Sequence, residues 1–156
     1  MTDTTGRQGD HAACAPDRLE GTLPSHPKYL PLVRAITVEA AELAGIETET
    51  ARHLMLAITE AWSNVIRHAY HNAEDQRIDF RFEASPGELL IEIEDHATWV
   101  DPSRIASRPL DQIRPGGLGV HLIQSTMDDV AYTRNEHGGT TLRLVKRVAP
   151  AEDPTS

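Results

Sequence analysis

The sequence is poor in cysteine, aromatic residues and basic residues, and it has no long hydrophobic run. Its one cysteine, Cys14, cannot form an internal disulfide, which favours a reducing compartment, and we expect a cytoplasmic protein. Lys and Arg number 15 against 24 Asp and Glu, so the net charge of −9 argues against direct nucleic-acid binding. No run approaches the roughly 18 apolar residues of a membrane span, and the first residues lack the pattern of a secretory leader.

The length of 156 residues fits one domain with a core of its own. Aromatic residues make up only 4% of the chain, so that core must be mostly aliphatic. Residues 1–17 and 149–156 show no hydrophobic periodicity, and we expect them to be flexible tails. The folded domain is therefore expected to span residues 18–148.

Hydrophobic periodicity predicts an α/β fold. Helical spacing of apolar residues predicts helices over 29–43, from a capping Thr48 to about Tyr70, and over 119–127. Alternation predicts strands over 18–23, 77–84, 89–93, 130–133 and 140–148, with a long loop over 96–116. This order predicts a two-layer sandwich, with helices on one face of a mostly antiparallel sheet.

Polar residues at helical spacing mark the first candidate site. Glu60, Asn64 and His68 fall in one column beside the apolar stripe of the second helix. A carboxylate and an amide one turn apart can together hold a metal ion and a water molecule. The competing interpretation is a solvated helix face with a local hydrogen bond, and His68 is read as structural.

Asp95 is the second candidate. It shares parity with Leu89, Ile91 and Ile93, so it points to the buried face at the end of its strand. A buried carboxylate needs a partner, which the amino group of a ligand would provide. A backbone amide or an arginine would satisfy it equally well.

Two glycine-rich segments complete the candidates. Gly116, Gly117 and Gly119 flank Leu118 ahead of a helix, where backbone amides and a helix N-terminus favour anions; a flexible turn is the alternative. Gly138 and Gly139 precede Thr140, whose inward parity would let its hydroxyl reach a ligand base, although a hairpin turn explains this segment too.

In this order, the motifs resemble those of the GHKL ATPases. The segment Glu60-Ala-Trp-Ser-Asn64-Val-Ile-Arg-His68-Ala-Tyr70 resembles their N-box, in the EAxxNxxxHAY form typical of bacterial anti-sigma serine kinases. Asp95 with Asp101-Pro102 resembles their adenine box, residues 114–119 their lid, and Gly139-Thr140-Thr-Leu their last strand. The resemblance covers about residues 18–148 and implies the Bergerat-type ATP-binding sandwich.

The resemblance also implies roles for the matching residues. Glu60 matches the base that activates the attacking hydroxyl, and Asn64 matches the Mg²⁺ ligand. Asp95 matches the acceptor of the adenine amine, which Thr140 supports. Residues 116–119 match the lid around the phosphates, where Arg67 and Arg114 are further possible contacts.

The implied function is an ATP- and Mg²⁺-dependent serine kinase in a partner switch. Such a kinase phosphorylates an anti-sigma antagonist with a STAS-like domain, sequesters a sigma factor or similar effector, and forms a homodimer. One departure favours a binding module without kinase activity: the family pattern Asp-x-Gly reads Asp95-His96-Ala97 here. The catalytic module of a histidine kinase is a weaker alternative, because a 17-residue tail has no room for a phosphoacceptor helix.

Overall fold

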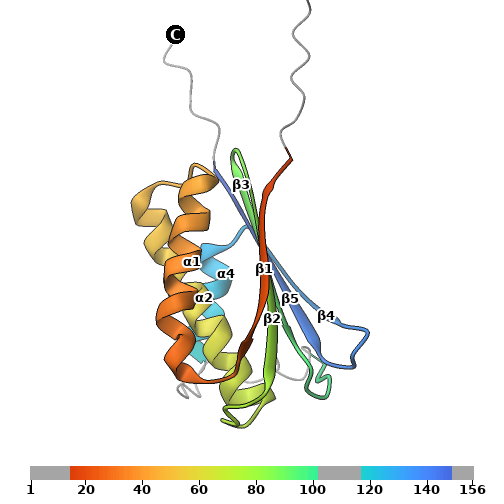
Figure 1. The fold of residues 1–156 in the computed structure, drawn as a ribbon. Coiled ribbons are helices and arrows are strands. Elements are labelled where there is room, and N and C mark those ends of the chain that lie inside the picture. Colours follow the sequence, from red (N-terminus) through yellow and green to blue (C-terminus); the bar gives the residue numbers. More distant parts are fainter. Residues whose placement is uncertain (1–14, 102–116, 149–156) are drawn as a thin grey trace, which may run out of the picture.

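A computed structural model describes residues 15–101 and 117–148, which form a two-layer α/β sandwich (Figure 1). The five strands are β1 (Asp17–Pro24), β2 (Arg77–Ser85), β3 (Glu88–Asp95), β4 (Asp129–Arg134) and β5 (Thr140–Arg147). They form one sheet in the order β1-β2-β3-β5-β4, and every neighbouring pair is antiparallel. The predicted fold class is confirmed.

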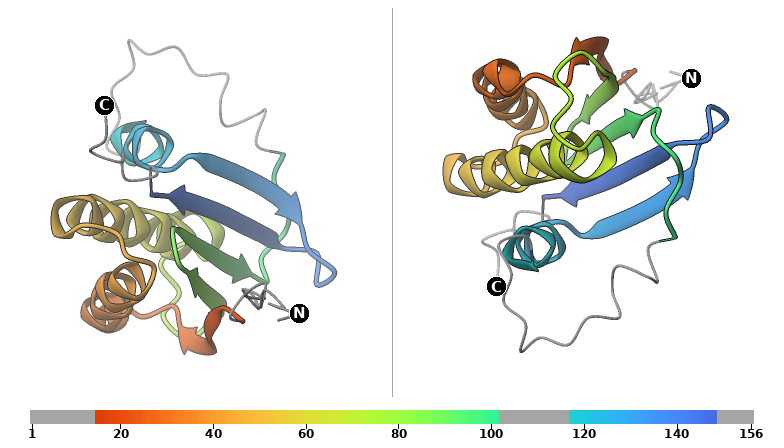
Figure 2. Two further views of the ribbon diagram at one scale, coloured as in Figure 1. Left: turned by 90° about the horizontal axis from the view of Figure 1, so that it is seen from above. Right: turned by 90° about the horizontal axis from the view of Figure 1, so that it is seen from below.

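The helices all lie on one face of this sheet (Figure 2). A 3₁₀ turn, η1 (Pro27–Tyr29), leads into α1 (Leu30–Leu43), and α2 (Thr48–Asn64) continues as a π-helical turn, η2 (Val65–Ala69). The last helix is α4 (Gly117–Thr126). Of the expected tails, 1–17 and 149–156, the structure describes only residues 15–17, and Asp17 already belongs to β1. Most of the predicted loop, 102–116, also lies outside the described residues.

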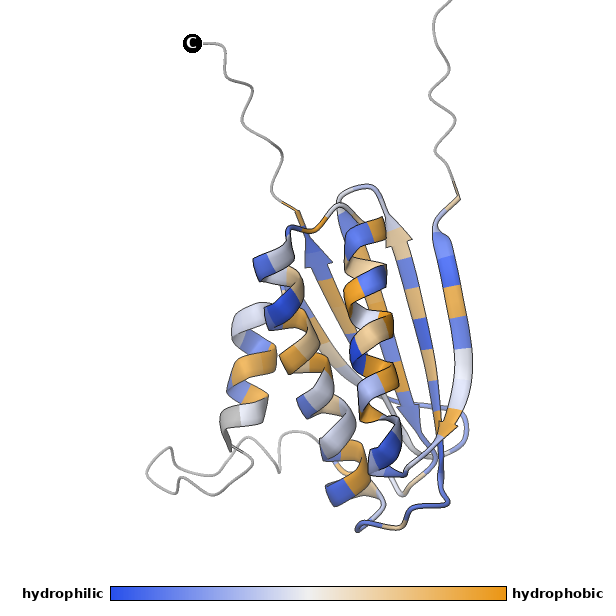
Figure 3. Cartoon of the chain, turned by 60° about the vertical axis from the view of Figure 1, so that its left-hand side comes forward, coloured by the Kyte–Doolittle hydropathy of each residue, from blue (hydrophilic) through white to orange (hydrophobic). Residues whose placement is uncertain are grey.

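Alternating side chains account for the two layers. Hydrophobic and hydrophilic residues alternate along the strands (Figure 3), so one face of the sheet packs on the helices while the other carries charged side chains. Ile78, Leu89, Ile91 and Ile93 are buried on the inner face, and Trp62 of α2 packs against Phe80 with ring centroids 5.9 Å apart. The core is mostly aliphatic, as the composition predicted.

The second helix departs from the prediction at both ends. Glu47, not Thr48, is the N-cap residue: its backbone is extended, whereas Thr48 is the first helical residue. At the other end, the Tyr70 N–H bonds to the Val65 carbonyl, five residues back, so the predicted α-helix to Tyr70 becomes a π turn after Asn64. Such turns occur often at functional sites.

One end of the sandwich brings four chain segments together. β3 ends there, opposite the β2–β3 turn, close to the end of α2, the start of α4 and the start of β5 (Figure 1). The described residues of all four predicted motifs fall on or directly beside these segments. None of the helices in the described parts of the chain is both long and apolar enough to span a membrane.

Candidate nucleotide site

The last turns of α2 and the π turn η2 that follows present an acid, an amide and a guanidinium together. Arg67 Nη2 lies 3.2 Å from Glu60 Oε2 and 3.4 Å from Asn64 Oδ1, and Arg67 Nε donates to the Ser63 carbonyl. The side chains of Glu60 and Arg67 are 37% and 39% exposed, so this cluster faces a solvent-accessible surface. Glu60 and Asn64 do lie together, as the helical column predicted.

Arg67, not His68, completes this cluster. His68 is exposed, and no hydrogen bond in the described part of the chain joins it to Glu60 or Asn64. Sequence reasoning gave Arg67 only as a possible phosphate contact. Its spacing of three from Asn64 and seven from Glu60 is a signal that could have identified it, because both spacings return to the same side of a helix.

Asp95 is buried at the end of β3, with 5% of the residue exposed. Its Oδ1 accepts hydrogen bonds from the backbone N–H of Ala97 at 3.0 Å and of Thr140 at 3.2 Å. Both bonds that the described residues donate to this carboxylate go to Oδ1, which leaves Oδ2 as an acceptor for a ligand amine. The backbone-amide alternative from the sequence therefore holds for one oxygen of Asp95.

The β4–β5 turn fixes Asp95 from the side. Asn135 Nδ2 donates to the Asp95 carbonyl at 2.8 Å, while Asn135 Oδ1 accepts the Gly139 N–H at 2.9 Å. Gly139 is buried, and a Cβ at this position would lie 2.7 Å from the Asp95 carbonyl carbon and 2.8 Å from Oδ1. The backbone at position 139 therefore lies so close to the backbone of Asp95 that only glycine, which has no Cβ, fits there.

Thr140 reaches Asp95 through its backbone amide. The sequence interpretation gave this role to the residue as a whole and suggested that its hydroxyl contacts a ligand base. The supporting contact in the structure comes from the amide, which any residue except proline would supply. Asn135 gave no signal in the sequence beyond its place in a turn.

The glycine-rich segment meets the cluster on α2 through the first turn of α4. Gly119 is buried, and a Cβ there would lie 2.7 Å from Glu60 Oε2. Gly117 and Leu118 also belong to the first turn of this helix, whose N-terminus carries partial positive charge. Arg114, Gly116 and the residue between them lie outside the described residues.

Ala97 fits the backbone that this turn adopts. Among the described residues other than glycine, only His71 and Asn72 have positive φ, so Ala97 avoids the left-handed region that favours glycine. Its N–H is one of the two donors to Asp95. The departure from the Asp-x-Gly pattern therefore costs no backbone strain.

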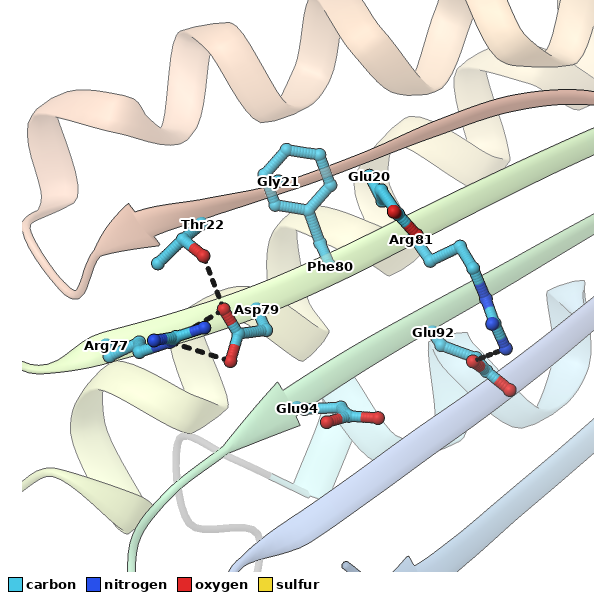
Figure 4. A pocket seen from close by; sticks show the side chains of 9 residues that line it. All are labelled: Glu20, Gly21, Thr22, Arg77, Asp79, Phe80, Arg81, Glu92 and Glu94. Atoms are coloured by element: carbon cyan, nitrogen blue, oxygen red, sulfur yellow. Dashed lines mark hydrogen bonds and ion pairs between the residues drawn. The ribbon is translucent and has the colours of Figure 1, made fainter. Parts of the chain in front are cut away.

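The outer face of the sheet holds a separate hollow of about 420 Å³ (Figure 4). Four of its six charged side chains pair with one another or with Thr22: Asp79 accepts from Thr22 and Arg77, and Arg81 pairs with Glu92. These mutual bonds occupy most of the polar groups with which a ligand in this hollow could bond. The carboxylate of Asp79 also lies 2.7 Å from His96 Nε2.

The polar groups fit a nucleotide and a phosphate-bound metal ion. A buried carboxylate with one open acceptor oxygen suits an amino-purine, and a guanidinium beside a helix N-terminus suits phosphate. The described residues contain no group of three or more His, Cys, Asp or Glu side chains arranged to hold a metal ion. The Asn64 amide would thus hold Mg²⁺ only together with ligand phosphates, as Mg²⁺ sites in kinases do.

A family model settles the relationship of this chain to known proteins. The model for the histidine kinase-like ATPase domain matches residues 23–146. The chain belongs to the histidine kinase-like ATPase family. Its match spans every element that forms the candidate nucleotide site.

Relatives within this family are bacterial serine-protein kinases. RsbW of Listeria monocytogenes is 31% identical over 140 residues, which cover 85% of this chain and 88% of the relative. RsbW of Oceanobacillus iheyensis is 28% identical over 144 residues, covering 87% and 90%. The expectation of an ATP-dependent serine kinase of the anti-sigma type is confirmed at the level of the family.

A solved structure supports the fold. The crystal structure of the RsbU and RsbW domains of Rv1364c from Mycobacterium tuberculosis superposes with a TM-score of 0.58 at 17% identity. The match covers 84% of this chain but only 32% of that one, so the chain spans about a third of the larger protein.

Proposed function

We propose that this kinase binds ATP with Mg²⁺ and phosphorylates a serine on an anti-sigma antagonist with a STAS-like domain. In the same partner switch it sequesters a sigma factor or similar effector. We also propose that it acts as a cytoplasmic homodimer. The family resemblance supports these partners and this state, and the site geometry supports the chemistry.

The proposal rests on one observation: two acidic side chains, Asp95 and Glu60, lie at the same end of the fold in different environments. Asp95 is buried and fixed through Oδ1, and no described residue donates a hydrogen bond to its Oδ2, which suits recognition of a neutral base. Glu60 is partly exposed and lies against a guanidinium and the first turn of α4, which suits phosphate chemistry. A nucleotide needs both kinds of site.

Glu60 is the proposed general base. A carboxylate in this position would orient and deprotonate the attacking serine hydroxyl. Arg67 holds the carboxylate in the structure, so its orientation is restricted before substrate arrives. When phosphates are present, the same guanidinium has a stronger partner, and its transfer to them would leave Glu60 free to accept a proton.

Asn64 is the proposed metal ligand. Among the described residues, its Oδ1 accepts from Arg67 alone, at 3.4 Å, which is long for a hydrogen bond and easily exchanged. Mg²⁺, when bound with the nucleotide, supplies charge neutralisation at the phosphates. The residues of the proposed lid, Gly116, Gly117, Leu118 and Gly119, would contribute backbone amides near them.

A binding module without kinase activity is the alternative that the Ala97 departure raised. Ala97 donates its N–H to Asp95 without a left-handed backbone, which weakens that alternative. The presence of Glu60 and Asn64 in mutual reach of Arg67 weakens it further.

The test is transfer of γ-labelled phosphate from ATP to an antagonist domain encoded beside this chain. We expect Mg²⁺-dependent labelling of one serine, and none when that serine is replaced by alanine. Tight binding of the antagonist without labelling would support the inactive binding module instead.

A further inference from the structure

Tyr70 joins the helix layer to the strand end that carries Asp95. Its hydroxyl accepts a hydrogen bond from the His96 N–H at 2.7 Å and donates one to the Arg77 carbonyl. The residue is only 8% exposed, and it directly follows the π turn that contains Arg67. The side chain of Tyr70 therefore links the end of the helix that bears the proposed phosphate-binding groups to the start of β2 and to the residue that follows β3.

Residues 95–97 form a short turn that depends on these bonds. Asp95 Oδ1 accepts the Ala97 N–H, which closes the turn on itself, and the β4–β5 hairpin holds it through Asn135 and Thr140. Those contacts all come from the sheet. Tyr70 adds one from the helix layer, at the residue between Asp95 and Ala97.

The protonation state of Tyr70 suits this arrangement. Burial raises the pKa of its hydroxyl, the hydrogen bond from His96 lowers it, and the carboxylates of Asp95 and Asp79 raise it again. The net direction is upward, so the phenol stays neutral and can donate and accept at once.

We infer that Tyr70 is a positioning residue for adenine recognition: its hydroxyl fixes the turn at His96 so that Asp95 Oδ2 faces the base. This inference rests on the proposed nucleotide site and adds a determinant of its base specificity. Without the Tyr70 hydroxyl, the His96 N–H and the Arg77 carbonyl each lose a hydrogen-bond partner in a partly buried environment, which is unfavourable. The turn would then shift toward water, and the Asp95 carboxylate would shift with it.

The imidazole of His96 is held on the other side of the turn. It contacts Asp79 on the outer face of the sheet and stacks on His137, with ring centroids 4.6 Å apart. The side chain of His96 is thus held where the sheet ends, while its backbone amide is held by Tyr70. Loss of the tyrosine hydroxyl releases only the backbone side of this residue.

The test compares ATP and GTP affinities of the parent, Tyr70→Phe and Tyr132→Phe. Tyr132 is a matched control, because it also packs against the core and no hydrogen bond in the described part of the chain involves its hydroxyl. We expect Tyr70→Phe to narrow the preference for ATP over GTP by about threefold to tenfold, the effect of one misplaced hydrogen bond. Tyr132→Phe should keep the parent's preference.

The ratio of two affinities is independent of the fraction of protein that is folded, so general destabilisation does not imitate the effect. Amide hydrogen exchange adds a second measurement: the His96 amide should exchange faster in Tyr70→Phe than in Tyr132→Phe. An unchanged ATP preference in Tyr70→Phe would overturn this inference alone. A parent that binds ATP no better than GTP would contradict the proposed function as well.

Discussion

Gly139→Ala tests how Asp95 is held. The new methyl group would lie 2.7 Å from the Asp95 carbonyl carbon, closer still to its carbonyl oxygen, and 2.8 Å from Oδ1. Real Cβ atoms stay beyond 3.0 Å from such neighbours, and backbone cannot rotate aside as a flexible side chain can. The start of β5 must therefore move away from the end of β3.

The cost follows from the contacts that would be strained. Overpacking costs about 1–3 kcal/mol. The move would also weaken the Thr140 bond to Asp95 and the Gly139 bond to Asn135, each worth about 1 kcal/mol net. We expect a loss of about 3–5 kcal/mol, which lowers the melting temperature by about 6–20 °C for a domain of this size.

Gly119→Ala is the matched control. Its methyl group would lie 2.7 Å from Glu60 Oε2, but this atom ends a partly exposed side chain, which can turn away at the cost of its contact with Arg67, whereas backbone cannot. Alanine also favours a helix over glycine by about 1 kcal/mol. Thermal unfolding should therefore show a stable Gly119→Ala and a destabilised Gly139→Ala, with ATP affinity reduced in the latter. Equal melting temperatures for both variants would refute the close approach at Gly139.

Three further variants test individual contacts. Asp95→Asn should keep the two amide bonds through its carbonyl oxygen but turn an NH₂ group toward the adenine amine, so ATP affinity measured by calorimetry should fall by about 1–3 kcal/mol; parent-like affinity would exclude it as the base reader. Asn64→Ala should lower the Mg²⁺-dependent part of ATP affinity at least about tenfold, and equal Mg²⁺ dependence in parent and variant would leave Asn64 a structural residue. Burial raises the pKa of Asp79, but its hydroxyl, imidazole and guanidinium partners outweigh burial and hold that pKa below its ordinary 3.8. The parent should therefore exceed Asp79→Asn in urea stability above about pH 4 and lose that advantage as the pH falls through the lowered pKa; a constant difference across this range would contradict the pairing.

Local patterns predicted the fold and the placement of several candidate site residues. Alternation along residues 77–95 identified the β2–β3 hairpin and placed Asp95 on the buried face, because parity alone determines the face of a strand. Helical spacing brought Glu60 and Asn64 together for the same kind of reason. These inferences need only the geometry of one element.

The sequence predicted neither the π turn nor the contacts between elements that are distant along the chain. In the π turn after Asn64, a backbone N–H bonds to the carbonyl five residues back instead of four. A turn of five residues is too short to show this change in the hydrophobic periodicity. Tyr70 and His96 are 26 residues apart, and Asn135 and Asp95 are 40 apart, so their bonds exist only after the sheet and helices have packed. The glycine before Thr140 was noticed, but its close approach to Asp95 could not be deduced from sequence spacing.

Single-turnover phosphotransfer by Glu60→Gln tests the central claim most directly. Glutamine keeps the size of the side chain and an oxygen for Arg67, but it removes the basicity of the carboxylate. The variant should bind ATP with Mg²⁺ about as well as the parent while transferring phosphate to the antagonist serine about 10²–10⁴ times more slowly. Transfer at the parent's rate would contradict the assignment of Glu60 as the base and, with it, the mechanism proposed for this kinase.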